Sequence, residues 1–181
     1  MELSATAYVI LGVVRWEPRS GYEIKAVVDN STRFFWAASY GQIYPELKRL
    51  SEAGLIVGSE RPTGGRKRTV YEITADGEEE LRAWLRQPPQ TLEMRDEGLL
   101  KLFFANALPR EEALTILREM RERRLAVNRQ LAAIKEMKGE IEDPFPKIVL
   151  ESGLEFTQWF ADWCKRMEAR LLDSAPEKRS S

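Results

Sequence analysis

The feature that most constrains the fold is a β-hairpin signal in a chain whose other patterns are helical. Two short β-type runs, Leu55 to Ser59 and Thr69 to Ile73, flank Gly64-Gly65. Adjacent glycines permit the positive φ angles of a tight hairpin turn. The segment between the runs carries four cations, which are Arg61, Arg66, Lys67 and Arg68. The sequence therefore predicts a short, strongly basic hairpin.

Four helices are predicted around this hairpin, three before it and one after it. The first covers Ala5 to about Arg15, the second about Tyr22 to Asn30, and the third begins near Ser39. The fourth begins after Thr74, because the acidic residues that follow suit the first turn of a helix. Between the second and third helices lies the cluster Phe34-Phe35-Trp36. We expect this cluster to pack inward, since it is too aromatic for a loop in solvent.

The third helix has the clearest pattern. Its apolar residues recur at i, i+4 and i+7, at Ile43, Leu47 and Leu50, which indicates one buried stripe. Ser39 and Gln42 have the spacing of a capping box at the start of the helix. The polar and aromatic residues off the stripe are expected to face outward.

Two residues bear on the bounds of this helix. Gly54 follows its last turn, as a glycine beyond a helix C-terminus does. Pro45 is harmless in a first turn, but one turn later it costs a hydrogen bond. Either the helix starts later than Ser39 indicates or it bends at Pro45, and the sequence leaves both open.

Three helices, a hairpin and a further helix are the elements of a winged helix, a variant of helix-turn-helix. In such a unit the third helix enters the major groove of DNA and the hairpin reaches the flanking backbone or minor groove. Clustered Lys and Arg bind phosphates, whereas groups such as Gln and Tyr read base edges. The residues predicted to face DNA are Tyr40, Gln42, Tyr44, Lys48, Arg49, Arg61, Arg66, Lys67 and Arg68. The alternative is a protein-interaction adaptor of the same fold, whose basic hairpin docks an acidic partner without specific DNA binding.

The amino-acid composition excludes several classes of function. Lys and Arg number 28 against 29 Asp and Glu, so binding to nucleic acid would rest on a local patch. With no histidine and one cysteine, Cys164, the chain has no Ser-His-Asp or Cys-His catalysis and no His-ligated metal. It also has no disulfide and no Cys-based zinc site. The apolar run Ala5 to Val14 is too short to span a membrane. We expect a cytoplasmic protein without cofactor or metal that is not an enzyme.

The second half is predicted to be almost wholly helical. One helix covers Leu92 to Leu108, Pro109 opens the next, and the last begins near Lys147, after Asp143-Pro144 and Pro146 interrupt the pattern. In that last helix apolar positions alternate by four and three residues, at Val149, Gly153, Phe156, Phe160, Trp163 and Met167. We expect these residues, with Leu99 and Phe103, to form a dimer interface with a second copy of the chain. The alternative is a three-helix bundle within a monomer.

The expected fold is mostly α with a small β-hairpin: an N-terminal winged helix-turn-helix followed by a C-terminal α-helical dimerisation domain. Residues 1–87 form the DNA-binding domain and 88–94 a linker. Residues 95–173 form the helical domain, which is also the candidate effector domain, and 174–181 are expected to be a disordered tail. Two recognition helices in a twofold dimer fit a pseudo-palindromic operator on double-stranded DNA.

The sequence resembles the PadR family of bacterial repressors over nearly its whole length. The resemblance rests on Gly21-Tyr22-Glu23-Ile24-Lys25 and on the run from Tyr40 to Leu50, YGQIYPELKRL, followed by Gly54-Leu55-Ile56. It continues through Gly65 to Arg68, Tyr71 to Thr74 and Asp76-Gly77, and into the second half at Arg95-Asp96-Glu97, Leu99 to Phe104, Gly153-Leu154 and Trp163. The chain departs from the family at Phe34 to Ala38, where a lone Trp is usual.

The resemblance implies a homodimeric, sequence-specific transcriptional repressor. It adds Tyr22 and Ser39 to the predicted DNA contacts, with Tyr22 on the DNA backbone. It also implies a small effector, frequently aromatic, bound at or near the dimer interface and relieving repression. The candidate effector residues are Phe104, Trp159 and Trp163, although aromatics in an apolar helix stripe more often belong to a core. Cys164, beside Trp163, is expected to be a small buried side chain rather than a redox centre.

Overall fold

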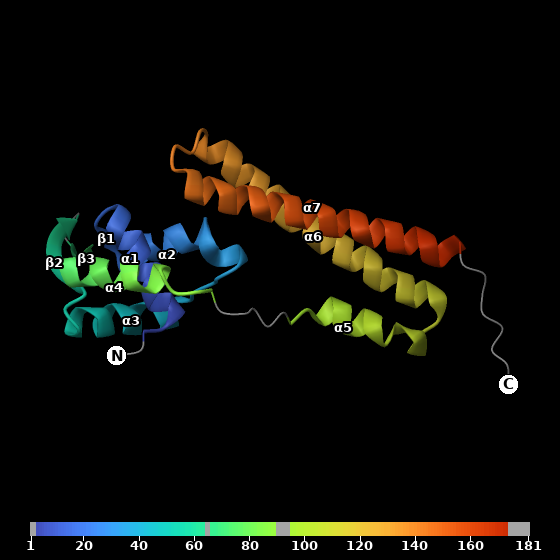
Figure 1. Ribbon diagram of the computed structural model, residues 1–181, viewed down its shortest axis with the longest axis horizontal. Helices are drawn as coiled ribbons and strands as arrows, with labels where there is room; N and C mark the ends of the chain where they lie inside the picture. Colours follow the sequence, from blue (N-terminus) through green and yellow to red (C-terminus); the bar gives the residue numbers. More distant parts are fainter. Residues whose placement is uncertain (1–2, 64–65, 90–94, 174–181) are drawn as a thin grey trace. The chain divides into compact units, whose positions relative to one another are not determined.

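The computed structural model describes residues 3–63, 66–89 and 95–173, apart from the side chains of residues 63, 66 and 67. The chain divides into two compact units, Met1–Thr91 and Leu92–Ser181. Both are mainly helical and the first carries a small antiparallel sheet (Figure 1), which confirms the predicted fold class. The Gly64-Gly65 turn, residues 90–94 of the predicted linker and the predicted tail lie outside the described residues.

The first unit contains the predicted helices and hairpin. Its elements in chain order are α1 (Ala5–Trp16), β1 (Arg19–Ser20), α2 (Gly21–Asp29), the 3-10 turn η1 (Thr32–Phe34), α3 (Tyr40–Glu52), β2 (Ile56–Thr63), β3 (Arg66–Ile73) and α4 (Ala75–Leu85). The sheet order is β1-β3-β2 with both pairs antiparallel. The two-residue strand β1 was not expected, because a run so short has no detectable periodicity.

The core of this unit lies between α1, α2 and α3. Ile10 and Leu11 of α1 are fully buried, as are Ile24 of α2 and Leu50 of α3. Each such side chain contributes about 1.5–3 kcal/mol on leaving water. A polar contact also joins α1 to α3, since the hydroxyl of Ser4, which caps α1, donates to Glu46 at 2.8 Å.

Both ends of α3 follow the predicted chemistry, and the structure excludes one of the two alternatives for Pro45. The helix begins at Tyr40 with Pro45 inside it, so the possibility of a later start is wrong. Proline has no N–H, so the carbonyl of Gly41 loses its partner four residues on. Gly54 has φ +72°, and the N–H of Leu55 donates to the carbonyl of Leu50 at 3.0 Å, which closes the helix end as predicted.

Two further expectations for this unit need correction. The strands extend to Thr63 and from Arg66, so the hairpin cations lie on strands rather than in a long turn. The cluster before α3 does not pack inward as a whole, because Phe35 is 62% and Trp36 44% exposed.

The second unit is built on two long helices. Its elements are α5 (Glu97–Phe103), the 3-10 turn η2 (Ala105–Ala107), α6 (Arg110–Lys138) and α7 (Pro144–Asp173). Helices α6 and α7 lie side by side as an antiparallel pair (Figure 1). Their shared core contains Leu117, Met120, Phe160 and Cys164, with Leu99 and Leu102 of α5 packed against it. No helix in the described part of the chain is long and apolar enough to cross a membrane.

The predicted bounds in this unit were wrong at two places. The helix expected over Leu92 to Leu108 is, within the described residues, only α5 followed by η2. The prolines expected to interrupt the chain instead open α7, where Pro144 and Pro146 occupy its first turn and Asp143 accepts a bond from the N–H of Phe145 at 3.0 Å. First-turn amides have no partner within the helix, so proline costs little there.

Candidate nucleic-acid interface

Helix α3 has a buried face and an exposed face. Ile43, Leu47 and Leu50 are buried, which confirms the predicted stripe. The opposite face carries the predicted contacts Tyr40, Gln42, Tyr44, Lys48 and, half-buried, Arg49. The helix thus presents a surface of rings, an amide and cations, all of which can bind base edges or phosphates.

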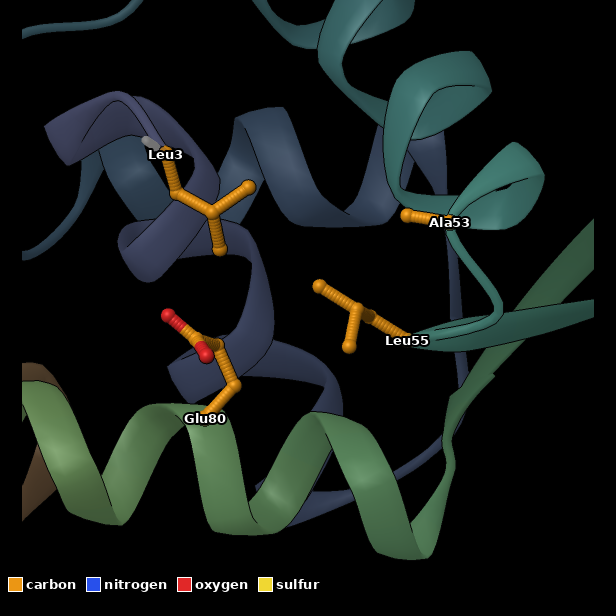
Figure 2. A pocket seen from close by; sticks show the side chains of 4 residues that line it. All are labelled: Leu3, Ala53, Leu55 and Glu80. Carbon is orange, nitrogen blue, oxygen red and sulfur yellow. The ribbon is translucent and has the colours of Figure 1, made fainter. Parts of the chain in front are cut away.

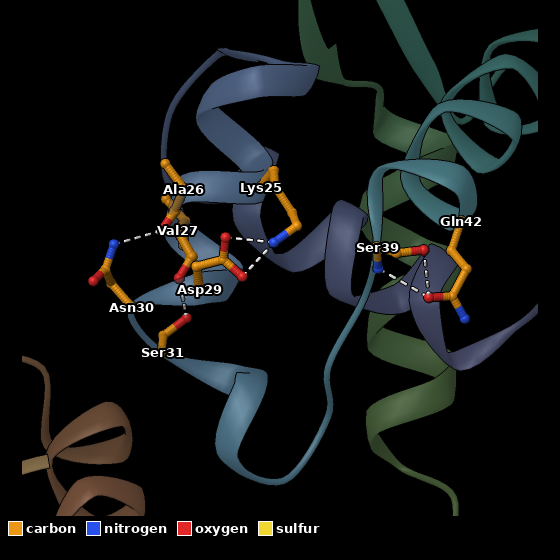
Figure 3. A network of polar contacts seen from close by, with 8 residues as sticks. All are labelled: Lys25, Ala26, Val27, Asp29, Asn30, Ser31, Ser39 and Gln42. Atoms are coloured by element: carbon orange, nitrogen blue, oxygen red, sulfur yellow. Dashed lines mark hydrogen bonds and ion pairs between the residues drawn. The ribbon is translucent and has the colours of Figure 1, made fainter. Parts of the chain in front are cut away.

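The start of α3 is held by its own side chains (Figure 3). The Oε1 atom of Gln42 accepts from the N–H of Ser39 at 2.9 Å and from its hydroxyl at 3.1 Å. This confirms the predicted capping box. It also limits what Gln42 can read. Bidentate recognition of adenine uses the carbonyl and the amide together, and here the carbonyl belongs to the cap.

Tyrosine rings fill the surface between α2 and α3. A Cβ atom on Gly21 would lie 2.8 Å from Cε1 of Tyr44, so the glycine makes room for that ring. Tyr40 lies against Tyr44 at 6.1 Å, with Nζ of Lys25 5.5 Å from the centre of the Tyr40 ring. Tyr22 is 69% exposed at the start of α2. Tyr44 therefore both packs and remains half exposed, whereas the Tyr22 side chain is mostly exposed.

The hairpin of β2 and β3 forms the wing of this unit, and its described cations Arg61 and Arg68 lie opposite each other on the two strands. Arg61 pairs in register with Arg68, which places two like charges side by side, an arrangement that is unfavourable unless compensated. Each accordingly contacts a carboxylate: Arg61 binds Glu72 at 3.0 Å and Arg68 binds Glu23 at 2.9 Å. The backbone of Arg66 and Lys67 lies in β3, but their side chains are outside the described residues.

The cations of α3 are compensated in the same way. Lys48 lies 3.7 Å from Glu52, and Arg49 lies 3.5 Å from Glu46. None of these four ion pairs was predicted from the sequence. The two on α3 have helical spacing, so the sequence could have revealed them, whereas the partners of Arg61 and Arg68 come from other strands and helices.

Glu23 has the most elaborate surroundings on this surface. It forms a capping box with Ser20, whose N–H and hydroxyl both donate to Oε2 at 2.8 Å. These bonds lower the pKa of the Glu23 carboxyl below its ordinary value, first through the backbone N–H of Ser20, then through its hydroxyl, with a smaller effect of Arg68. The spacing Ser20-x-x-Glu23 was readable in the sequence and was overlooked.

The second unit places the expected dimer residues in two groups. Phe160 is buried, Trp163, Met167 and Leu99 pack against the same core, and Gly153 lies against Leu131 of α6. These five positions pack within one protomer. Val149, Phe156 and Phe103 remain exposed. Other exposed apolar side chains near them in sequence are Leu100, Phe104, Phe145, Ile148 and Trp159.

The candidate effector residues are likewise divided. Trp159 is 54% exposed and stacks on Phe156 at 6.1 Å, while Trp163 lies against the buried Phe160 at 5.4 Å. Phe104 contacts the edge of Phe103 at 5.0 Å. The neighbouring Cys164 is 1% exposed, and its burial raises the pKa of its thiol. The expected packing role of Cys164 is therefore confirmed.

A polar cluster that the sequence did not predict lies inside this unit. The Arg124 guanidinium binds Asp96, the cap of α5, at 2.7 Å and lies 4.6 Å from the centre of the Phe160 ring. Nearby, the amide of Asn128 donates to the hydroxyl of Thr157 at 2.8 Å. These contacts tie α5 and α7 to α6 and fix their register.

A small cavity lies in the first unit, away from the exposed face of α3. It measures about 240 Å³ and is lined by Leu3, Ala53, Leu55 and Glu80 (Figure 2). The Glu80 carboxylate accepts from the hydroxyl of Tyr8 at 3.0 Å. Its volume is below the range of about 300–1,000 Å³ that small-molecule sites occupy, so the cavity is a poor candidate for an effector site.

The first unit defines a class of protein, the winged helix-turn-helix proteins. Its third helix is exposed along one face and a basic two-stranded wing follows it. Residues 10–83 match the family model described as "Transcriptional regulator PadR-like family", and residues 94–171 match "Virulence activator alpha C-term".

Known relatives cover both units. The chain is 30% identical over 174 residues to the negative transcriptional regulator PadR of Bacillus subtilis, covering 91% of this chain and 96% of that protein. The crystal structure of that PadR with operator DNA matches at a TM-score of 0.85 with 30% identity, covering 93% of this chain and 99% of that one. The virulence activator AphA of Vibrio cholerae matches at 0.72 with 25% identity, covering 94% and 100%. The chain belongs to the PadR-like family of transcriptional regulators.

Proposed function

We propose that this protein is a homodimeric transcriptional repressor that binds a pseudo-palindromic operator on double-stranded DNA. The observation that carries the proposal is the joint exposure of Gln42 and Lys48 on α3 and of Arg61 and Arg68 on the wing. A crystal structure of the Bacillus subtilis relative contains operator DNA. The family and the charged surface together favour DNA over an acidic protein partner, and no enzymatic role is proposed. A repressor of this kind acts in the cytoplasm.

The proposed DNA contacts fall into two groups. Gln42 and Tyr44 on α3 lie where base edges would be read, together with Ser39 and Tyr40. Phosphates would be bound by Tyr22, Lys48, Arg49, Arg61, Arg66, Lys67 and Arg68. Because its carbonyl caps α3, Gln42 is proposed to read a base by donating from its amide, which suits an acceptor in the major groove such as guanine O6 or thymine O4.

The dimer is proposed from the exposed apolar side chains of the second unit. Phe103 is 79%, Phe145 74% and Trp159 54% exposed, which is a large apolar surface for a protein in water. A second copy of α5 and α7 would cover it, with Val149 and Phe156 at the contact. Gly153, Phe160, Trp163, Met167 and Leu99 would support this surface from within the protomer.

The effector is proposed to be a small aromatic molecule. The Bacillus subtilis relative has been crystallised with p-coumaric acid; that structure matches at a TM-score of 0.77 with 28% identity over 96% of this chain and all of that one. In this chain the exposed rings of Phe104 and Trp159, together with the half-buried Trp163, offer flat surfaces on which an aromatic ring can stack.

Fluorescence anisotropy tests the DNA-binding function. The purified protein is titrated against a labelled duplex from its own promoter and against a scrambled duplex, at several salt concentrations. We expect saturable, tighter binding to the promoter and a steep loss of affinity with salt, since cations replace counterions on the phosphates. Equal weak binding to both duplexes would contradict the proposal and favour the adaptor.

The role of Gln42 has its own measurement. The variant Gln42→Ala is expected to lose about 1–3 kcal/mol of discrimination between the promoter and the scrambled duplex. The variant Lys48→Ala is the matched control, because a lost phosphate contact weakens binding to both duplexes alike. Parallel weakening by Gln42→Ala on both duplexes would contradict a base-reading role.

A further inference from the structure

The two carboxylate oxygens of Glu23 perform separate tasks. Oε2 accepts from the N–H and the hydroxyl of Ser20 and so caps α2. Oε1 accepts from Nη1 of Arg68, on β3, at 2.9 Å. The two residues are 45 positions apart in the sequence. One side chain therefore fixes the start of a helix and holds a cation of the wing.

The cap makes Glu23 a well-placed anion. Its carboxylate cannot swing away without releasing Ser20, so its charge stays beside Arg68. The side chains of Arg68 and Glu23 are 44% and 35% exposed, so a DNA phosphate can reach the pair. The carboxylate holds the guanidinium through Nη1, so a phosphate that approaches Arg68 competes with Glu23 for the same cation.

We propose that Glu23 is an intramolecular competitor of the DNA backbone, which neutralises Arg68 in the free protein and lowers the affinity of the wing for any duplex. This inference rests on the proposed DNA-binding function. A cation already paired with a carboxylate releases fewer counterions when it meets a phosphate, so the pair reduces both affinity and salt dependence. Glu23 thereby acts as a positioning residue for Arg68, and the contact restrains binding to unrelated DNA.

The substitution Glu23→Gln separates the two tasks of the side chain. Glutamine at this position of a capping box still accepts from the cap residue, so α2 keeps its start. Its neutral amide does not hold the guanidinium as a carboxylate does. We therefore expect the melting temperature to fall only slightly, through loss of the carboxylate charge, and by less than in Ser20→Ala. Ser20→Ala should lower it, because that variant removes the cap and leaves the partner of Arg68 in place.

The test compares five proteins by anisotropy on the promoter and the scrambled duplex over a range of salt: the wild type, Glu23→Gln, Glu79→Gln, Arg68→Ala and the double variant. We expect Glu23→Gln to bind both duplexes about two- to fivefold more tightly, as the loss of an exposed ion pair implies. The slope of log affinity against log salt should steepen by about one. Glu79→Gln on α4 is the matched control: it also removes one carboxylate paired with arginines, and no change is expected. In the Arg68→Ala background, Glu23→Gln should have no effect.

Three results would overturn the inference. The first is an unchanged affinity of Glu23→Gln for both duplexes. The second is weaker binding by that variant at a melting temperature close to that of the wild type. The third is a gain in affinity that persists in the Arg68→Ala background. Each of them presupposes that the wild type binds the promoter duplex. Failure of the wild type to bind would instead overturn the proposed function itself, so the two failures are distinguishable.

Discussion

Gly77 offers a sharp test of how the wing is attached to the helices. It lies in the first turn of α4, and a Cβ atom there would sit 2.1 Å from the backbone oxygen of Leu55, the residue directly before β2. That same oxygen accepts from the N–H of Thr74 at 3.1 Å. The variant Gly77→Ala must therefore push α4 away from the α3–β2 corner.

The loss of unfolding free energy in Gly77→Ala follows from this close approach. A carbon atom approaches a carbonyl oxygen to about 3.3 Å, so backbone must move by about 1.2 Å. Overpacking of this kind costs about 1–3 kcal/mol, and weakening the bond from Thr74 adds about 1 kcal/mol. The higher helix propensity of alanine offsets about 1 kcal/mol of this cost. We expect Gly77→Ala to lower the free energy of unfolding by about 1–3 kcal/mol.

Gly12 in α1 is the matched control, because a Cβ atom there meets nothing within 4 Å. Gly12→Ala makes the same chemical change in a helix and should stabilise the protein by about 0.5–1 kcal/mol. Urea unfolding followed by circular dichroism measures both variants. Opposite signs are expected, together with weaker promoter binding by Gly77→Ala because β2 shifts. If both alanines stabilise equally, the close approach of α4 to Leu55 does not exist and the reasoning is refuted.

Three further predictions concern ionic and apolar contacts. The pKa of Glu23 is lowered in the folded state, so its contribution to stability is present above its ordinary value of about 4.3 and is lost as the pH falls through the folded pKa. Acid titration of the unfolding free energy should thus show a loss in the wild type that Glu23→Gln lacks. Arg124→Leu should lower the free energy of unfolding by about 1–3 kcal/mol, because it leaves the half-buried carboxylate of Asp96 without its cation. Adding Asp96→Asn, which keeps the cap of α5, should restore part of the lost stability. No recovery in the double variant would contradict the pairing. The Ile148 side chain on α7 is 59% exposed. The variant Ile148→Lys should therefore shift the protein from dimer to monomer in analytical ultracentrifugation without lowering its helix content. An unchanged dimer would show that α7 does not form the contact at that position.

Local patterns predicted much of the first unit. The stripe Ile43, Leu47 and Leu50 fixed which side of α3 is buried, because helix geometry alone relates those positions. The cap at Ser39 and the end at Gly54 also depend only on neighbouring residues. By contrast, Phe35 and Trp36 are aromatic and yet exposed. Composition cannot show whether a partner surface exists for a ring.

The second unit shows where periodicity alone is insufficient. A seven-residue rhythm gives the same stripe whether the helix packs against its own chain or against another copy. Phe160 and Phe156 both belong to the predicted stripe of α7, yet Phe160 is 5% and Phe156 44% exposed. The difference depends on where α6 lies, which is a property of the pair of helices and not of either sequence.

Residue types and short-range spacing were enough to predict the class of fold, the exposed face of α3 and the cations of the wing. How those cations are held became visible only with the packed helices and strands. The tertiary structure brings Arg68 to Glu23 across 45 positions and Arg124 to Asp96 across 28. Such partners meet because helices and strands pack in three dimensions, and no local pattern encodes a contact between segments so far apart.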